Sequence, residues 1–147
     1  MASFSIAFTG FDDEDPLVAF GELRLGEHSE RFQSVLGFWE PADYRVIWMA
    51  GLRRLLSGAS VSCLATSVLD PAAANFIEVW PLYRQDDDVY VQNHLLLLDE
   101  LPHKFDPAAP WDSIGPRSVI DEDGQEISEW RITVGEIREF LESQRQG

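Results

Sequence analysis

The stretch from Trp39 to Val68 constrains the fold most, because it joins a long amphipathic pattern directly to a strand-like one. Its first part carries apolar residues at the 3.6-residue period of a helix that buries one face: Tyr44, Ile47, Trp48, Leu52, Leu55 and Leu56. Pro41 suits the first helical turn, where a backbone N–H lacks a partner anyway. Gly58 suits the left-handed position just past a helix end. We therefore expect one long helix over about 41–57, followed at once by a strand.

The segments on either side of this stretch alternate between apolar and polar residues, as half-buried strands do. Strand-like runs cover residues 3–9, 18–25, 30–36, 60–68, 76–83, 89–98 and 127–132. A capping-box pattern at Thr133 and Glu136 predicts a short C-terminal helix over about 134–143. Strands joined by short turns favour antiparallel pairing. The sequence predicts a single α+β domain over 1–147, with a mainly antiparallel sheet of about six to seven strands backed by the long helix.

Two features bear on the order of these strands. The run from Val89 to Leu98 is the most β-prone in the chain, and its continuous apolar end predicts a central place in the sheet. Pro81 lies within another strand-like run and cannot donate a ladder hydrogen bond. It therefore predicts a sheet edge, a bulge or a strand end.

The charge balance narrows the classes of partner. The chain has 26 Asp and Glu against 11 Lys and Arg, a formal net charge of −15. Such a surface repels nucleic acid and anionic membranes, and it attracts basic proteins. The alternative is that the acidity serves solubility alone. No apolar run approaches the ~20 residues of a membrane span, and no signal-peptide pattern is visible, so we expect a cytoplasmic protein.

Sequence patterns typical of catalysis are missing. No Gly-x-Ser-x-Gly elbow and no glycine-rich phosphate loop occurs, and the single cysteine, Cys63, sits among apolar residues that favour a buried thiol. The Asp121–Gly124 turn fails as a calcium loop, because Val119 and Trp130 would occupy its first and last ligand positions. We expect no catalytic residue, no cofactor and no metal. One alternative remains, a small enzyme whose pocket uses His94 with a nearby Glu or Asp.

Clusters of carboxylates in turns are the remaining candidates for a working surface. A rigid sheet would present them to the Lys and Arg side chains of a basic protein. For any single cluster, a merely solvated turn is an equal alternative. The candidate partner-binding residues are Asp12, Asp13, Glu14 and Asp15, then Asp86, Asp87 and Asp88, and finally Asp121, Glu122 and Asp123.

A family resemblance supports this interpretation. The pattern Trp48-x3-Leu52-x2-Leu55-Leu56-x-Gly58-x-Ser60 resembles the CdiI immunity proteins of bacterial contact-dependent growth inhibition systems. The run 89–96 and the tail 127–132, with Ile137, Phe140 and Leu141, carry the same resemblance.

This resemblance implies a small, non-enzymatic protein made beside a toxin in the same cell. It would bind the C-terminal domain of that toxin and block its active site or substrate access. Such toxins are often nucleases, and the acidic surface of this chain independently indicates a basic partner. An adaptor or chaperone for a secreted effector is a further alternative.

Overall fold

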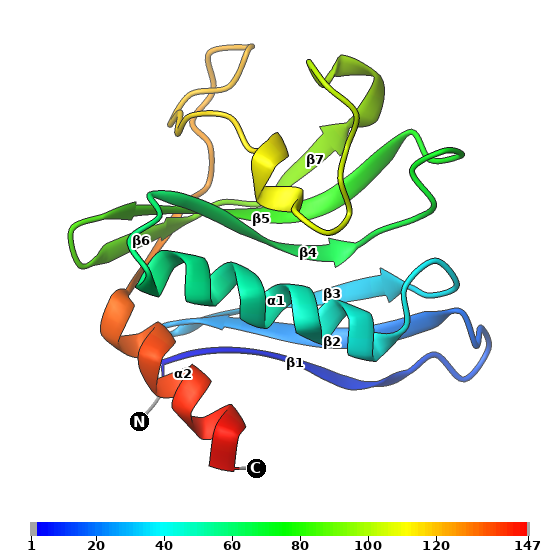
Figure 1. The fold of residues 1–147 in the computed structure, drawn as a ribbon, viewed down its shortest axis with the longest axis horizontal. Coiled ribbons are helices and arrows are strands. Elements are labelled where there is room, and N and C mark those ends of the chain that lie inside the picture. Colours follow the sequence, from blue (N-terminus) through cyan, green and yellow to red (C-terminus); the bar gives the residue numbers. More distant parts are fainter. Residues whose placement is uncertain (1–2, 147) are drawn as a thin grey trace.

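The computed structural model describes residues 3–146, which form eight strands, two α-helices and two short 3-10 helices (Figure 1). In chain order they are β1 (Phe4–Phe11), β2 (Val18–Leu25), β3 (His28–Val35), α1 (Pro41–Leu56), β4 (Val61–Ser67), β5 (Phe76–Gln85), β6 (Asp88–Val91), β7 (His94–Leu97), η1 (Leu98–Glu100), η2 (Pro110–Ser113), β8 (Trp130–Thr133) and α2 (Val134–Gln146). The α+β class, the antiparallel pairing and both helices are confirmed. The C-terminal helix is longer than its expected span of about 134–143.

The strands divide between two sheets, where the sequence suggested one. Strands β1, β2 and β3 form an antiparallel meander. The second sheet has the order β4-β5-β6-β8, with β7 added to β5. The long α1 separates β3 from β4 in the chain, so β4 starts a new sheet instead of extending the first. The two sheets still meet, because Ser34 Oγ donates to the carbonyl oxygen of Thr66 at 2.5 Å.

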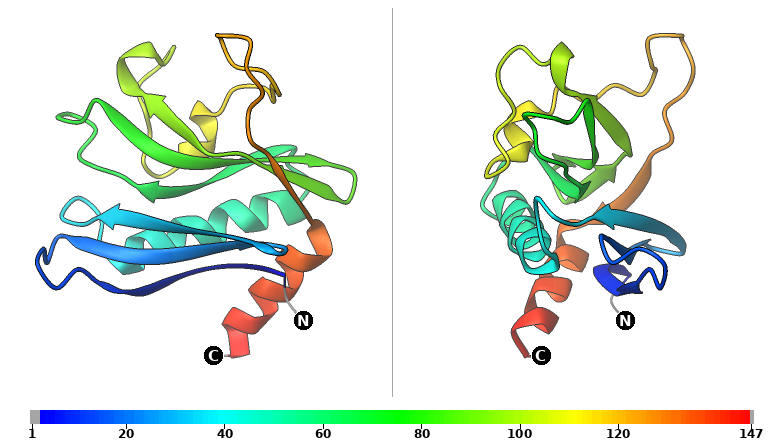
Figure 2. Two further views of the ribbon diagram at one scale, coloured as in Figure 1. Left: turned by 180° about the vertical axis from the view of Figure 1, so that it is seen from behind. Right: turned by 90° about the vertical axis from the view of Figure 1, so that its right-hand side faces the viewer.

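Helix α1 lies along both sheets and holds them together (Figures 1 and 2). The hydroxyl of Tyr44 donates to the carbonyl of Val35 at 2.7 Å and accepts from the N–H of Val68 at 2.9 Å. The indole N–H of Trp48 donates to the carbonyl of Ala65 at 2.7 Å. Both rings are fully buried. Each ring therefore packs in the apolar core while its polar atom remains hydrogen-bonded. These hydrogen bonds fix the position of α1 along β4.

Strand β5 is central in its sheet, and Pro81 explains an interruption along its second edge. Strands β6 and β7 both pair with β5, and they do so in the same register. The pairing is interrupted between these two strands, starting at Gln92. The N–H of Gln92 donates to Pro81 O at 3.1 Å, but proline has no N–H to return the bond. The predicted central place is confirmed for β6, between β5 and β8, and is wrong for β7. Leu95 and Leu97 of β7 are exposed, and its outer edge pairs with no strand within residues 3–146.

The predicted capping box begins α2. The N–H of Thr133 donates to Glu136 Oε1 at 3.0 Å, and the N–H of Glu136 donates to Thr133 Oγ1 at 3.1 Å. The helix then packs on the three-stranded sheet through an edge-to-face contact of Phe140 with Phe4, at 5.4 Å between ring centres. None of the helices in the described part of the chain is both long and apolar enough to cross a membrane.

Candidate functional site

A groove is lined by residues of both sheets, and none of its lining residues comes from α1. Its wider part has a volume of about 890 Å³, and an adjoining part measures about 410 Å³. Alternation along β2 explains which side it occupies, because Ala19 and Leu23 are buried in the core whereas Phe20 and Glu22 line the groove. We call it the inter-sheet groove. Its main lining side chains are Phe20, Glu22, Arg31, Phe76, Glu78 and Leu95 in the wider part and Glu30, Trp80 and Trp130 in the adjoining part.

One wall of the groove carries an exposed apolar patch. Phe76 pairs with Leu97 across β5 and β7, and Glu78 pairs with Leu95. Directly paired residues project to the same face of a sheet, so Phe76, Leu95 and Leu97 form one patch, with exposed fractions of 46%, 57% and 44%. Single exposed apolar side chains are common on proteins, but a group on neighbouring strands is typical of an interaction site.

The groove also carries an excess of negative charge. Glu22, Glu30 and Glu78 line it together with one cation, Arg31. Glu22 and Arg31 face each other across β2 and β3. The hydroxyl of Thr66 donates to Glu78 Oε1 at 2.6 Å, which holds that carboxylate in place near the start of β5. Three carboxylates against one guanidinium suit a cationic ligand.

The structure places the predicted acidic turns outside this groove and apart from one another. The 12–15 cluster lies in the turn from β1 to β2, and the 86–88 cluster lies at the β5–β6 turn, at opposite ends of the molecule (Figure 1). The 121–123 cluster lies in the long segment before β8. Within residues 3–146, no three His, Cys, Asp or Glu side chains gather as metal ligands.

Some of these carboxylates have a local structural task. Asp12 Oδ1 accepts the N–H of Glu14, and Asp121 Oδ1 accepts the N–H of Asp123, each at 2.9 Å. Such bonds stabilise turns of this kind. Sequence reasoning missed the groove instead. The alternation that puts Phe76 and Glu78 on one face was readable, but their approach to β2 and β3 depends on how the two sheets meet.

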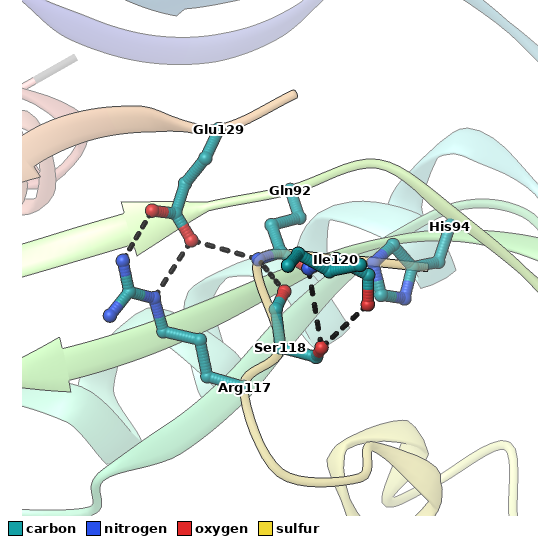
Figure 3. A network of polar contacts seen from close by, with 6 residues as sticks. All are labelled: Gln92, His94, Arg117, Ser118, Ile120 and Glu129. Carbon is teal, nitrogen blue, oxygen red and sulfur yellow. Dashed lines mark hydrogen bonds and ion pairs between the residues drawn. The ribbon is translucent and has the colours of Figure 1, made fainter. Parts of the chain in front are cut away.

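A polar network fastens the segment before β8 onto the second sheet (Figure 3). Arg117 donates to both carboxylate oxygens of Glu129, at 2.8 Å from Nε and 2.5 Å from Nη2. The buried amide of Gln92 donates to Glu129 Oε2 at 2.8 Å and to the carbonyl of Ser118 at 2.9 Å. The Arg117 hydrogen bond, opposed by burial and helped by Gln92, lowers the pKa of Glu129. The network thus joins an irregular segment to β6 by charge-assisted bonds.

The same network decides the role of His94. Because the Gln92 amide nitrogen uses both hydrogens on Ser118 and Glu129, its oxygen faces His94, 2.7 Å from Nε2. Nε2 therefore carries the hydrogen and donates it. Burial lowers the pKa of His94, which favours this neutral form. The imidazole is bonded to an amide, and the neighbouring Glu129 is engaged by Arg117, so the geometry does not favour the enzyme alternative.

Cys63 is fully buried beneath α1, and burial raises the pKa of its thiol. A buried thiol with a raised pKa is a poor nucleophile, because the thiolate is the reactive form. The prediction of a buried thiol is confirmed.

Comparison with known proteins identifies the family. Residues 34–140 match the family model described as the CdiI N-terminal domain. The chain belongs to the CdiI family. It is 35% identical over 130 residues to the protein named Immunity protein CdiI from Enterobacter cloacae subsp. cloacae, covering 88% of this chain and 89% of that protein. The resemblance inferred from the sequence is confirmed.

The structure of this CdiI-family chain also matches a solved one. A chain of the structure titled CdiA-CT/CdiI toxin and immunity complex, from Enterobacter cloacae, superposes with a TM-score of 0.86 at 33% identity. The match covers 98% of this chain and 99% of that chain. The family match begins at the end of β3, so it contains the β5–β7 wall of the groove, whereas most of the other wall precedes it.

Proposed function

We propose that this chain is an immunity protein, which binds the C-terminal domain of a cognate contact-dependent growth inhibition toxin and neutralises it without catalysis. The observation that carries this proposal is the nearly full-length similarity, at 33% identity, to a chain from a complex described as toxin and immunity. The curated relative named Immunity protein CdiI supports the same role.

We further propose that the toxin domain is basic and is a nuclease. A cleft that binds phosphates offers Lys and Arg side chains, and these also bind carboxylates in charge-assisted pairs. A chain with a net charge of −15 complements such a cleft. Bound there, it would exclude the substrate by bulk and by repulsion of its phosphates.

The acidic turns supply the long-range part of this attraction. The three clusters lie in different parts of the molecule, so one compact partner would not cover all of them together. We propose that they speed the encounter through the summed field of the surface. A turn that borders the bound toxin would add direct ion pairs.

The test uses the C-terminal domain of the toxin encoded directly beside this chain. We expect the chain to co-purify with that domain and to restore growth to cells that express it. An unrelated acidic protein of similar size and charge is the control, because it separates specific binding from general attraction. Continued growth arrest with this chain, at a level equal to the control, would contradict the proposal.

A further inference from the structure

We propose that the inter-sheet groove is the docking surface for the toxin domain, and that it receives a basic segment of that domain. This inference rests on the proposed function. Cationic side chains of the segment pair with Glu22 and Glu78, and an apolar side chain packs on the patch of Phe76, Leu95 and Leu97.

The apolar patch gives the groove its affinity. Leu95 is the most exposed of the three side chains, at 57%, and it stands directly opposite Glu78. Covering this patch removes apolar surface from water, which is the main favourable term in protein association. A partner with no apolar side chain at this point would leave that gain unused.

The charges select the kind of segment that fits. Glu22, Glu30 and Glu78 outnumber Arg31 in the groove walls, so an acidic segment is repelled and a basic one is attracted. A cleft lined by one sign of charge also concentrates the field between its walls. The bond from Thr66 already orients the Glu78 carboxylate, so less side-chain freedom is lost on binding.

The size of the groove indicates that it receives a segment of the toxin domain and not a single side chain. The wider part, about 890 Å³, is at the upper end of the range for sites that hold drug-sized ligands. The residues that line this wider part all lie on strands of the two sheets and not on loops. Strand-built walls hold their side chains in place more accurately than loops do.

The experiment uses the C-terminal toxin domain encoded directly beside this chain. That domain is immobilised on a surface, and the association and dissociation rates of the full chain are measured. The groove variants are Leu95→Arg and Glu22→Lys, and the matched control is Val46→Arg. Val46 is 66% exposed on α1 and is not among the residues that line the groove, so its replacement adds the same charge as Leu95→Arg at a different surface. Each variant is first checked for an unchanged melting temperature, because Leu95 and Val46 are exposed whereas Glu22 is half-buried.

We expect both groove variants to raise the dissociation rate about tenfold or more, as loss of a central contact does, with little change for Val46→Arg. Hydrogen exchange on the wild-type complex should show protection of residues 76–80 and 94–97. If the wild-type chain bound tightly and both groove variants dissociated at the wild-type rate, the groove assignment would be wrong while the proposed function would stand. If the wild-type chain did not bind the toxin domain, the proposed function would fall and the groove assignment with it.

Discussion

The α-carbon of Gly51 lies so close to β4 that a β-carbon there would stand 2.6 Å from the carbonyl oxygen of Cys63. The neighbouring Ser62 Oγ donates to the carbonyl of Gly51 at 2.7 Å. Helix α1 therefore rests directly on the backbone of β4 at this point. A glycine in a helix interior is otherwise unfavourable, so its place here is explained by the close approach.

Replacing Gly51 with alanine should destabilise the fold. Alanine favours the helix by up to about 1 kcal/mol, but the added methyl group must displace a strand backbone, and overpacking costs about 1–3 kcal/mol. We expect a net loss of about 1–2 kcal/mol in the free energy of unfolding, measured by urea denaturation. Gly135→Ala in α2 is the control, because its β-carbon would meet nothing nearer than Thr133 Oγ1 at 3.8 Å. Equal stability of the two variants would contradict this account.

The long helix was predictable because its signals are local. The apolar period, Pro41 in the first turn and Gly58 just beyond the end all act within a few residues, and Gly58 has the left-handed φ of +105° expected there. The division into two sheets was not predictable in this way. It depends on whether β4 pairs with β3, although all of α1 separates these two strands in the chain. No local sequence pattern indicates whether they pair.

The candidate site shows the same limit. The acidic turns were visible as runs of like residues, so sequence reasoning chose them. The groove joins Glu22 to Glu78, which are far apart in the chain and meet only through the contact of two sheets. The prediction that Pro81 marks a sheet edge, a bulge or a strand end is wrong, because Pro81 lies inside the central strand β5 and pairs with Cys63 of β4. Its missing N–H shows instead in the break between β6 and β7. The exposure of Leu95 on the far side of that break also needed the structure.

Removing the Arg117 guanidinium should release the segment before β8. Arg117→Ala leaves the Glu129 carboxylate, whose side chain is 15% exposed, with the Gln92 amide as its remaining bonded partner. A lost charge-assisted bond of this kind costs about 1.5–3 kcal/mol. We expect faster hydrogen exchange across residues 115–129 and an increase in the pKa of Glu129.

Arg131→Ala is the matched control for that variant. Arg131 lies 3.4 Å from Asp88, with side-chain exposures of 63% and 37%, and exposed pairs of this kind contribute little. Exchange across residues 115–129 should therefore stay close to that of the wild type. If Arg117→Ala also left this exchange unchanged, the network would not be what holds the segment.

Stability should fall between pH 7.5 and 5.5 because of His94. Burial lowers the pKa of His94 below its unfolded value of about 6.5, so the unfolded chain takes up a proton more readily. The contribution of neutral His94 is complete above that unfolded value and is lost as the pH falls through it toward the folded pKa. The lowered pKa of Glu129 acts in the same direction, but only at more acidic pH.

Urea denaturation at several pH values checks this expectation. His94→Gln replaces the imidazole with a neutral group of similar hydrogen-bonding capacity, so its stability should change less between pH 7.5 and 5.5. His28 and His103 remain in both proteins and serve as an internal reference. An identical pH slope in the wild type and in His94→Gln would show that His94 is not the cause of the pH dependence.

Reversing charge at the β5–β6 turn should slow the encounter with the toxin domain. Asp86 has a left-handed φ of +56°, which asparagine accepts more readily than lysine, so the variant is Asp86→Asn with Asp87→Lys and Asp88→Lys. We expect association several-fold slower at low salt and a flatter dependence on ionic strength, because the steering field is weaker. The dissociation rate should change little, in contrast to the groove variants. A control with asparagine at all three positions removes charge without reversing it. Its association rate should lie between those of the wild type and the charge-reversed variant. If the reversed variant instead dissociated faster with unchanged association, this turn would be a direct contact and not a source of steering.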